Sequence, residues 1–226
     1  GEYMLKKLVV AAAAALALTA GVGVGTASAA PVAVLGGGSG ILIADSSGKG
    51  KFDCTLTTIG NDNAGRLVGI TAGHCGVPGD LVGAEYLPDA GAVGRIVSSV
   101  GGLDYAVIEF DRNRVAPTNR VGNVTITGVG EPATFPGIMC KEGRTTGNTC
   151  GITYGELFQN DRTYTQICVQ QGDSGGPVVA GTTLVGMVNA YLGIPCIGPE
   201  VGTNIRAVFD DINRGGGVGT GFVPAP

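Results

Sequence analysis

The sequence predicts an all-β fold, and three observations support that class. The 226 residues include 42 glycines, which favour a chain with many turns. Short segments rich in β-branched and apolar residues recur along the chain, separated by turn signals. Only one segment has the spacing of an amphipathic helix. Such a chain is typical of a sandwich or a barrel rather than of alternating strands and helices.

The strand-like segments follow one another from residue 40 onward. They are 40–44 (GILIA), 66–72 (RLVGITA), 104–110 (DYAVIEF), 123–130 (NVTITGVG) and 183–192 (TLVGMVNAYL). Between them lie turn-forming stretches such as NDNAG, GVPGD, LPDAG and RTTGN.

The C-terminal part predicts a short helix followed by a tail. Residues 204–214 (NIRAVFDDINR) place apolar side chains on one helical face. These side chains are Ile205, Val208, Phe209 and Ile212. The Gly- and Pro-rich residues 215–226 predict a loose, flexible tail.

The N-terminus predicts an export signal over residues 1–29. Two lysines at 6–7 precede an apolar stretch, 8–20, and the small residues at 27–29 place the cleavage after Ala29. A membrane anchor is disfavoured, because the apolar stretch is short and mostly alanine, whereas a span needs about 20 apolar residues. The first three residues are interpreted as a cloning scar or a misplaced start. We therefore expect a protein exported to the medium or the cell envelope, with no stable membrane insertion after cleavage.

Composition and cysteine content exclude several partners. The formal net charge is −4 and no basic run occurs, so a nucleic-acid partner is not expected. The chain has one histidine, no C-x-x-C and no cofactor or calcium-loop motif, so neither a metal nor a cofactor is expected. An even number of cysteines in an exported chain predicts three disulfides, and spacing alone does not choose the pairing. The six lie at Cys54, Cys75, Cys140, Cys150, Cys168 and Cys196.

Three residues far apart in the sequence could carry catalysis. Ser174 lies in GDSGG (172–176), which by itself is equally a tight glycine turn. His74 follows an apolar strand and a glycine and adjoins Cys75, a rigid place for a general base, although a lone histidine is often structural. Asp104 opens an apolar strand and is either a solvated strand end or a buried acid that holds an imidazole.

Together these motifs resemble the chymotrypsin family of serine proteases. TAGHC, DYAVIEF and GDSGGPV occur in the order His, Asp, Ser, and the resemblance covers most of residues 34–214. It is most similar to the bacterial α-lytic protease and streptogrisin branch, whose disulfide-closed loop resembles MCKEGRTTGNTCG (139–151). The resemblance implies two six-stranded antiparallel β-barrels, roughly 34–115 and 116–203, followed by the helix.

The resemblance also implies the roles and the disulfides. Ser174 would be the nucleophile, His74 the general base and Asp104 the acid that holds it, while the backbone N–H groups of Gly172 and Ser174 would form the oxyanion hole. The implied disulfides are Cys54–Cys75, Cys140–Cys150 and Cys168–Cys196.

Asp173 should be buried beside the oxyanion hole and therefore needs a cationic partner. We expect Lys141, which stands where the bacterial branch has an arginine, although a lysine is a looser match than a guanidinium fork. Arg144, and the amine of Val34 after a second cleavage, remain alternatives.

The substrate side departs from the family pattern. No acid lies between Thr163 and Gln171, so pairing with a Lys or Arg side chain of the substrate is disfavoured. The predicted substrate-binding residues are Val169, Asn189, Ala190 and Tyr191. The resemblance implies a Ser-Gly-Gly segment at 189–191. Asn189 therefore replaces a serine and can still donate to Asp104, and Tyr191 replaces a glycine at the pocket mouth. Tyr191 either narrows the pocket to small side chains or points to solvent.

The most consistent interpretation is a secreted, monomeric serine endopeptidase that cuts proteins or peptides after small or apolar residues through an acyl-enzyme. The alternative is a non-catalytic or self-inhibited binding protein on the same fold, since a fold does not fix function.

Overall fold

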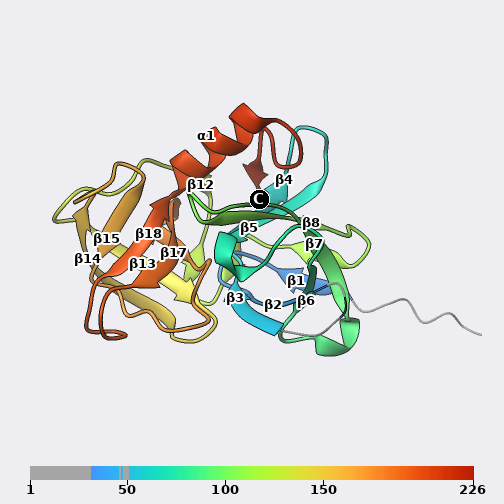
Figure 1. The fold of residues 1–226 in the computed structure, drawn as a ribbon, viewed down its shortest axis with the longest axis horizontal. Helices are drawn as coiled ribbons and strands as arrows, with labels where there is room; N and C mark the ends of the chain where they lie inside the picture. Colours follow the sequence, from blue (N-terminus) through green and yellow to red (C-terminus); the bar gives the residue numbers. More distant parts are fainter. Residues whose placement is uncertain (1–31, 46, 48–50) are drawn as a thin grey trace, which may run out of the picture.

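The computed structural model describes residues 32–45, 47 and 51–226. Two groups of strands lie side by side, and helix α1 (Ile205–Gly215) lies with the C-terminus above them in Figure 1. The predicted export signal falls outside the described residues. Within the described ranges, no helix is long and apolar enough to cross a membrane.

The first barrel is built from the N-terminal half. Its strands are β2 (Gly40–Ala44), β3 (Lys51–Thr55), β4 (Thr58–Asn61), β5 (Leu67–Ala72), β6 (Leu81–Ala84), β7 (Ala92–Val100) and β8 (Tyr105–Phe110). They pair in the order β4-β5-β8-β7-β6-β2-β3. Only Leu56 and Thr57 separate β3 from β4, so one bent segment supplies strands at both ends of this order and curls the sheet into a barrel.

The second barrel follows from residue 128. Its strands are β12 (Gly128–Val129), β13 (Ile138–Gly143), β14 (Gly147–Gly155), β15 (Arg162–Thr165), β16 (Pro177–Ala180), β17 (Thr183–Tyr191) and β18 (Glu200–Asn204). The order β17-β16-β13-β14-β15-β18 closes through pairing of β17 with β18, and β12 adds in parallel to β17. The predicted all-β double barrel is therefore confirmed.

Four short strands form two separate two-stranded sheets outside the barrel sheets. They are β1 (Ala33–Leu35), β9 (Val115–Pro117), β10 (Arg120–Val121) and β11 (Val124–Thr125). β1 pairs with β9 in parallel, so the start of the described chain is attached to the end of the first barrel.

Strand β8 is buried on both faces, which explains why its sequence is an almost unbroken apolar run. Successive strand residues point to opposite faces. Ala106 and Ile108 face the interior of the first barrel, whereas Tyr105 and Val107 belong to a second cluster between the two barrels. We call that second cluster, formed by β5, β8, the second barrel and α1, the interface core. The predicted helix face enters it through Ile205, Val208 and Ile212, with Phe209 packed at its margin.

The expectation of a loose tail was wrong. Strand β19 (Val223–Pro224) pairs with β4, and the ring of Phe222 stacks on Phe209 with centroids 5.0 Å apart. The N–H of Gly219 donates to the buried Asp62 carboxylate over 3.1 Å. The Gly- and Pro-rich composition suggested disorder, but Phe222 packs against α1 and β19 adds to the free edge of β4.

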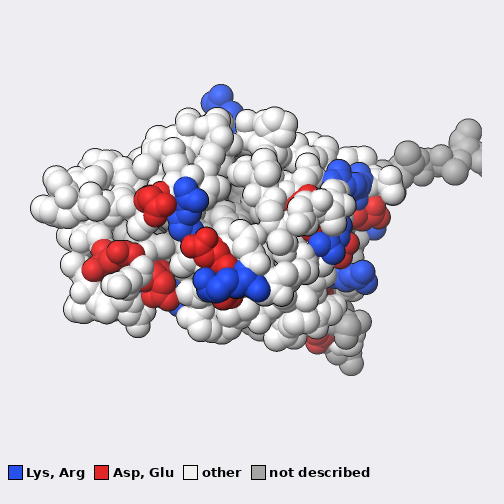
Figure 2. All heavy atoms as spheres, turned by 90° about the horizontal axis from the view of Figure 1, so that it is seen from above, with Lys and Arg blue, Asp and Glu red and all other residues white. Residues whose placement is uncertain are grey.

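Charges are sparse, and on the face seen in Figure 2 acidic and basic side chains lie next to each other. Ion pairs of the described residues include Arg206 with Glu131 at 3.1 Å and Arg214 with Asp211 at 2.9 Å. Exposed pairs of this kind contribute at most about 1 kcal/mol, so stability rests on the apolar cores.

Phe222→Ala should lower the free energy of unfolding by about 2 kcal/mol, because it removes both apolar burial and the stacked ring pair. Urea unfolding measures this. Ile197→Ala is the control, since that side chain is 71% exposed and its loss should cost less than about 0.5 kcal/mol. Equal values for the two variants would show that the tail does not contribute to stability.

Candidate active site

His74 stands where the first barrel opens. β5 ends at Ala72, and a single 3-10 turn over Gly73–Cys75 carries the imidazole out of the strand. Cys75 is bonded to Cys54 of β3, which ties the turn to the neighbouring strand. The His74 side chain is 48% exposed and is therefore accessible from solvent.

Asp104 meets His74 from the turn before β8. Its carboxylate lies 2.9 and 3.1 Å from His74 Nδ1, and the backbone N–H of His74 donates to it over 2.8 Å. Burial alone would raise the pKa of Asp104, but the hydrogen bonds and charge of His74, with a hydrogen bond from Asn189, outweigh it and hold that pKa below its usual value. The acid is thus an ionised acceptor for the imidazole.

The side chain of Asn189 points to Asp104. Its amide nitrogen donates to both the backbone carbonyl and the carboxylate of Asp104, each over 2.8 Å. Its amide oxygen accepts from the N–H and the hydroxyl of Thr203, each over 2.7 Å. The Asn189 side chain, which the sequence analysis placed among the substrate-binding residues, is therefore hydrogen-bonded to Asp104.

The turn that carries Ser174 is fastened by two threonines of the first barrel. Thr55 donates its N–H to the Ser174 carbonyl over 2.8 Å and its hydroxyl to the Gly172 carbonyl over 2.9 Å. Thr57 donates to the Gly175 carbonyl over 2.6 Å. A Cβ on Gly175 would lie 2.2 Å from the Thr55 carbonyl, and its φ is +84°, so only glycine fits there.

Two N–H groups of this turn remain without an acceptor among the described residues. Asp173, Gly175 and Gly176 each donate their backbone N–H to a carbonyl. Gly172 and Ser174 do not. A backbone donor is normally paired, so this neighbouring pair of free donors marks a place for an external acceptor.

His74 and Ser174 line the same cavity of about 410 Å³. The other lining residues are Lys51, Phe52, Asp53, Cys54, Cys75, Arg144, Gln171 and Gly172. The imidazole and the serine turn come from different barrels, so the cavity lies at the junction between the barrels.

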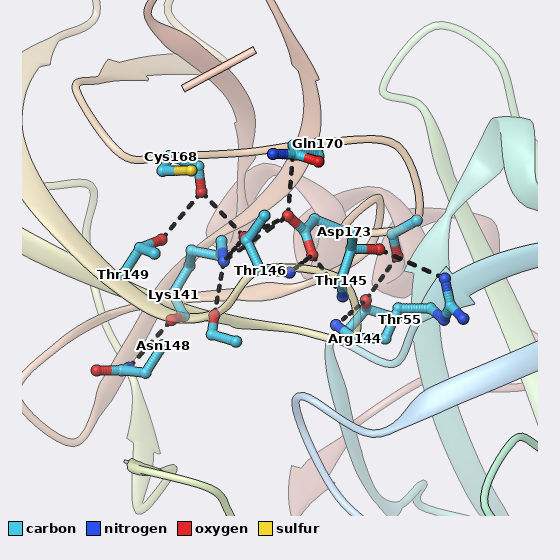
Figure 3. A network of polar contacts seen from close by, with 12 residues as sticks. Thr55, Lys141, Arg144, Thr145, Thr146, Asn148, Thr149, Cys168, Gln170 and Asp173 are labelled. Carbon is cyan, nitrogen blue, oxygen red and sulfur yellow. Dashed lines mark hydrogen bonds and ion pairs between the residues drawn. The ribbon is translucent and has the colours of Figure 1, made fainter. Parts of the chain in front are cut away.

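Asp173 is fully buried and accepts hydrogen bonds from four donors (Figure 3). One oxygen accepts from the N–H groups of Thr145 and Thr146 over 2.9 and 3.0 Å. The other accepts from the Thr146 hydroxyl over 2.6 Å and the N–H of Gln170 over 3.0 Å. The carboxylate thus fixes the closed loop 140–150 against the serine turn.

Of the three candidate cations, the structure brings Lys141 to Asp173. Its fully buried Nζ lies 3.8 Å from the carboxylate and donates to Thr146 and Gly147. Burial lowers the pKa of Lys141, and the charge of Asp173 opposes that shift.

The other two candidates are engaged elsewhere. Arg144 pairs with Glu85, with its Nε 2.8 Å from the carboxylate, and Val34 lies within β1, where its N–H donates to Tyr86. In Figure 3, Arg144 joins the network through its backbone N–H, which donates to the Thr55 hydroxyl over 3.1 Å, while its guanidinium pairs with Glu85 rather than with Asp173.

The predicted specificity residues lie apart from this cavity. Val169 is 2% exposed and packs in the core of the second barrel with Val188, and Tyr191 packs against the same cluster. Ala190 is exposed. None of the predicted residues Val169, Ala190 and Tyr191 lines the cavity that holds His74 and Ser174.

The disulfides have the pairing that the resemblance implies, and all six cysteines take part. Cys140–Cys150 joins directly opposed residues of β13 and β14. Within the described ranges, no cluster of three or more His, Cys, Asp or Glu side chains could hold a metal ion.

Sequence reasoning missed a buried acid, Glu200. One carboxylate oxygen accepts from Thr165 over 2.5 Å, and the other, Oε1, has no partner among the described residues. Gly202 provides the space, because a Cβ there would lie 2.6 Å from Oε1. Burial raises the pKa of Glu200 to about 8, against opposing effects of Thr165 and Lys141. No local signal marked this residue, since its burial follows from barrel closure.

The double barrel is the chymotrypsin-like fold of serine proteases. The crystal structure of Thermobifida fusca Protease A superposes with a TM-score of 0.67 at 23% identity, covering 85% of this chain and 100% of that one. At this identity, the likeness shows the fold.

In sequence, about half of the chain is similar to parts of two bacterial serine proteases. It is 30% identical to streptogrisin-C of Streptomyces griseus over 134 residues, which are 54% of this chain and 29% of that protein. It is 34% identical to serine protease 1 of Rarobacter faecitabidus over 125 residues, which are 49% of this chain and 24% of that protein. The matches thus span less than a third of either relative. No protein-family model matches the sequence.

Glu200→Gln should change how stability depends on pH. The folded protein keeps the Glu200 proton up to about pH 8, whereas the unfolded chain releases it near 4.5, so this acid lowers stability as pH rises between those values. The wild type should lose on the order of 3–5 kcal/mol relative to the variant across that window. Urea unfolding at both ends of the window measures the difference.

The matched control is Glu131→Gln, because that carboxylate is 76% exposed. It should follow the wild type at each pH. A Glu200→Gln variant whose stability also runs parallel to the wild type would contradict the assignment of a buried, protonated acid.

Proposed function

We propose that this chain is an exported serine endopeptidase that hydrolyses peptide bonds through an acyl-enzyme on Ser174. The observation that carries the proposal is the meeting of two barrels at one cavity: the His74–Asp104 pair opens on it from the first barrel, and Ser174 enters it from the second. A nucleophile, a base and an acid that orients the base are the parts this chemistry needs. The similarity to streptogrisin-C and serine protease 1 supports the same reaction class.

The proposed reaction has two steps. Ser174 Oγ attacks the peptide carbonyl carbon while His74 takes the hydroxyl proton, and collapse of the tetrahedral intermediate breaks the C–N bond as His74 gives that proton to the leaving amine. A water then attacks the ester by the same route and releases the acid. Asp104 keeps the tautomer in which Nδ1 carries a proton and stabilises the imidazolium that forms in each step.

The oxyanion of each intermediate would bind the free N–H groups of Gly172 and Ser174. These groups are the unpaired donors of the serine turn, and the hydrogen bonds from Thr55 and Thr57 hold that turn in place before the substrate arrives. Donors fixed in advance stabilise developing charge without reorganisation, which makes such a site effective.

Protein and peptide substrates follow from this reaction, and we propose a preference for small or apolar residues before the scissile bond. The basis of this preference is the sequence, in which no acid lies between Thr163 and Gln171 to pair with a basic substrate side chain. In the structure, Val169 and Val188 are buried in the core of the second barrel, and Tyr191 packs against that core. An extended substrate strand would then pair with the backbone of Asn189 to Tyr191, at the end of β17.

Export is proposed from the sequence of residues 1–29 and is supported by the three disulfides, which form and persist in oxidising compartments. The working protein would therefore lie outside the cytoplasm.

The folded, oxidised protein should gain the mass of one fluorophosphonate adduct, read by intact-mass spectrometry. Ser174→Ala should gain none and should lose about 10⁴-fold or more in peptide hydrolysis, whereas Ser98→Ala should behave as the wild type. A folded wild type that is not labelled would contradict the proposal and favour a binding protein on this fold.

A further inference from the structure

The acid of the site stands on a strained backbone. Asp104 has φ = +51°, a left-handed conformation that a residue with a Cβ rarely adopts. Such strain persists only where the surroundings hold the chain firmly. The segment concerned, Gly102–Asp104, is the turn between β7 and β8 of the first barrel.

Arg162 of the second barrel holds the first part of this turn. Nη1 donates to the carbonyl of Leu103 over 3.0 Å, and Nη2 donates to the carbonyl of Gly102 over 2.8 Å. The two donors belong to one rigid, planar group, so a single side chain fixes the relative position of two consecutive carbonyls.

Thr203 and Asn189 hold the rest. The Thr203 hydroxyl lies 2.8 Å from the Leu103 carbonyl and 2.7 Å from the Asn189 amide oxygen, and its single proton can serve one of them at a time. The N–H of Thr203 donates to the same amide oxygen, so the orientation of Asn189 does not depend on that choice. The Asn189 amide nitrogen is thereby aimed at the Asp104 carbonyl and carboxylate.

We infer that Arg162 is a positioning residue for the His74–Asp104 pair. Together with Thr203 and Asn189 it forms a clamp in which the second barrel binds three consecutive carbonyls, those of Gly102, Leu103 and Asp104, and so imposes the conformation that directs the acid at His74. The inference rests on the proposed protease activity, because the clamp matters only if that pair works as base and acid.

The test replaces the guanidinium of Arg162, which does not line the cavity that holds His74 and Ser174. Arg162→Met should lower kcat on the order of 10²-fold with little change in KM, because a displaced Asp104 reduces the stabilisation of the transition state and leaves substrate binding unchanged. Arg162→Lys keeps the positive charge but not the planar pair of donors, and its kcat should lie between those of the wild type and Arg162→Met. Arg206→Met is the control, since Arg206 on α1 pairs with Glu131 and does not contact the turn.

A second readout is independent of turnover. The chain has one histidine, so ¹⁵N-histidine labelling reports His74 without assignment. In the Ser174→Ala background, the downfield resonance of the Nδ1 proton shared with Asp104 should weaken or move in Arg162→Met and Arg162→Lys and stay unchanged in Arg206→Met.

The outcomes separate the two proposals. If the wild type labels with fluorophosphonate but both Arg162 variants keep the wild-type kcat and the wild-type proton resonance, the clamp is only structural and the inference is overturned. A fall in thermal stability without those changes has the same meaning. If the wild type does not label, the protease proposal fails, and the resonance still decides whether Arg162 positions the pair. Should Arg162→Met not fold, Arg162→Lys carries the test.

Discussion

The placement of the site depends on backbone carbonyls that are satisfied across the junction of the barrels. The serine turn belongs to the second barrel, and its carbonyls at Gly172, Ser174 and Gly175 accept from Thr55 and Thr57 of the first. The acid turn belongs to the first barrel, and its carbonyls accept from the second. A buried carbonyl without a hydrogen-bond donor costs free energy, so neither turn can move alone. The same hydrogen bonds fix the relative position of the two barrels next to His74, Asp104 and Ser174.

The buried charges of the second barrel follow a similar logic. Asp173 receives its direct hydrogen bonds from two backbone N–H groups of the closed loop, one from Gln170 and one hydroxyl, so Lys141 at 3.8 Å supplies charge rather than geometry. A point charge is sufficient for that purpose, which explains why the predicted lysine can serve at this position without a guanidinium fork. Glu200, whose pKa is about 8, is protonated at neutral pH and adds no second negative charge beside this pair.

Local patterns allowed much of this molecule to be predicted. The apolar run of β8, the face of α1 and the order of the histidine, aspartate and serine motifs are properties of short segments, and the structure has the strands and helix that they indicate. The clamp could not be predicted that way, because Arg162 and Thr203 contact Leu103 across 59 and 100 residues of sequence. The tail was misjudged for the same reason, since its strand partner β4 is remote from it in the chain.

Asn189 shows how one substitution places demands on a second position. Where the resemblance implies a serine, a hydroxyl could donate to the acid and leave no second group to satisfy. An amide brings an oxygen as well, which at this depth must find a donor. Thr203 supplies two, and because one of them is its backbone N–H, the amide cannot turn over and present its oxygen to the Asp104 carboxylate. Asparagine at this position is therefore compatible with an ionised acid only while β18 keeps Thr203 in its present register opposite Met187 on β17.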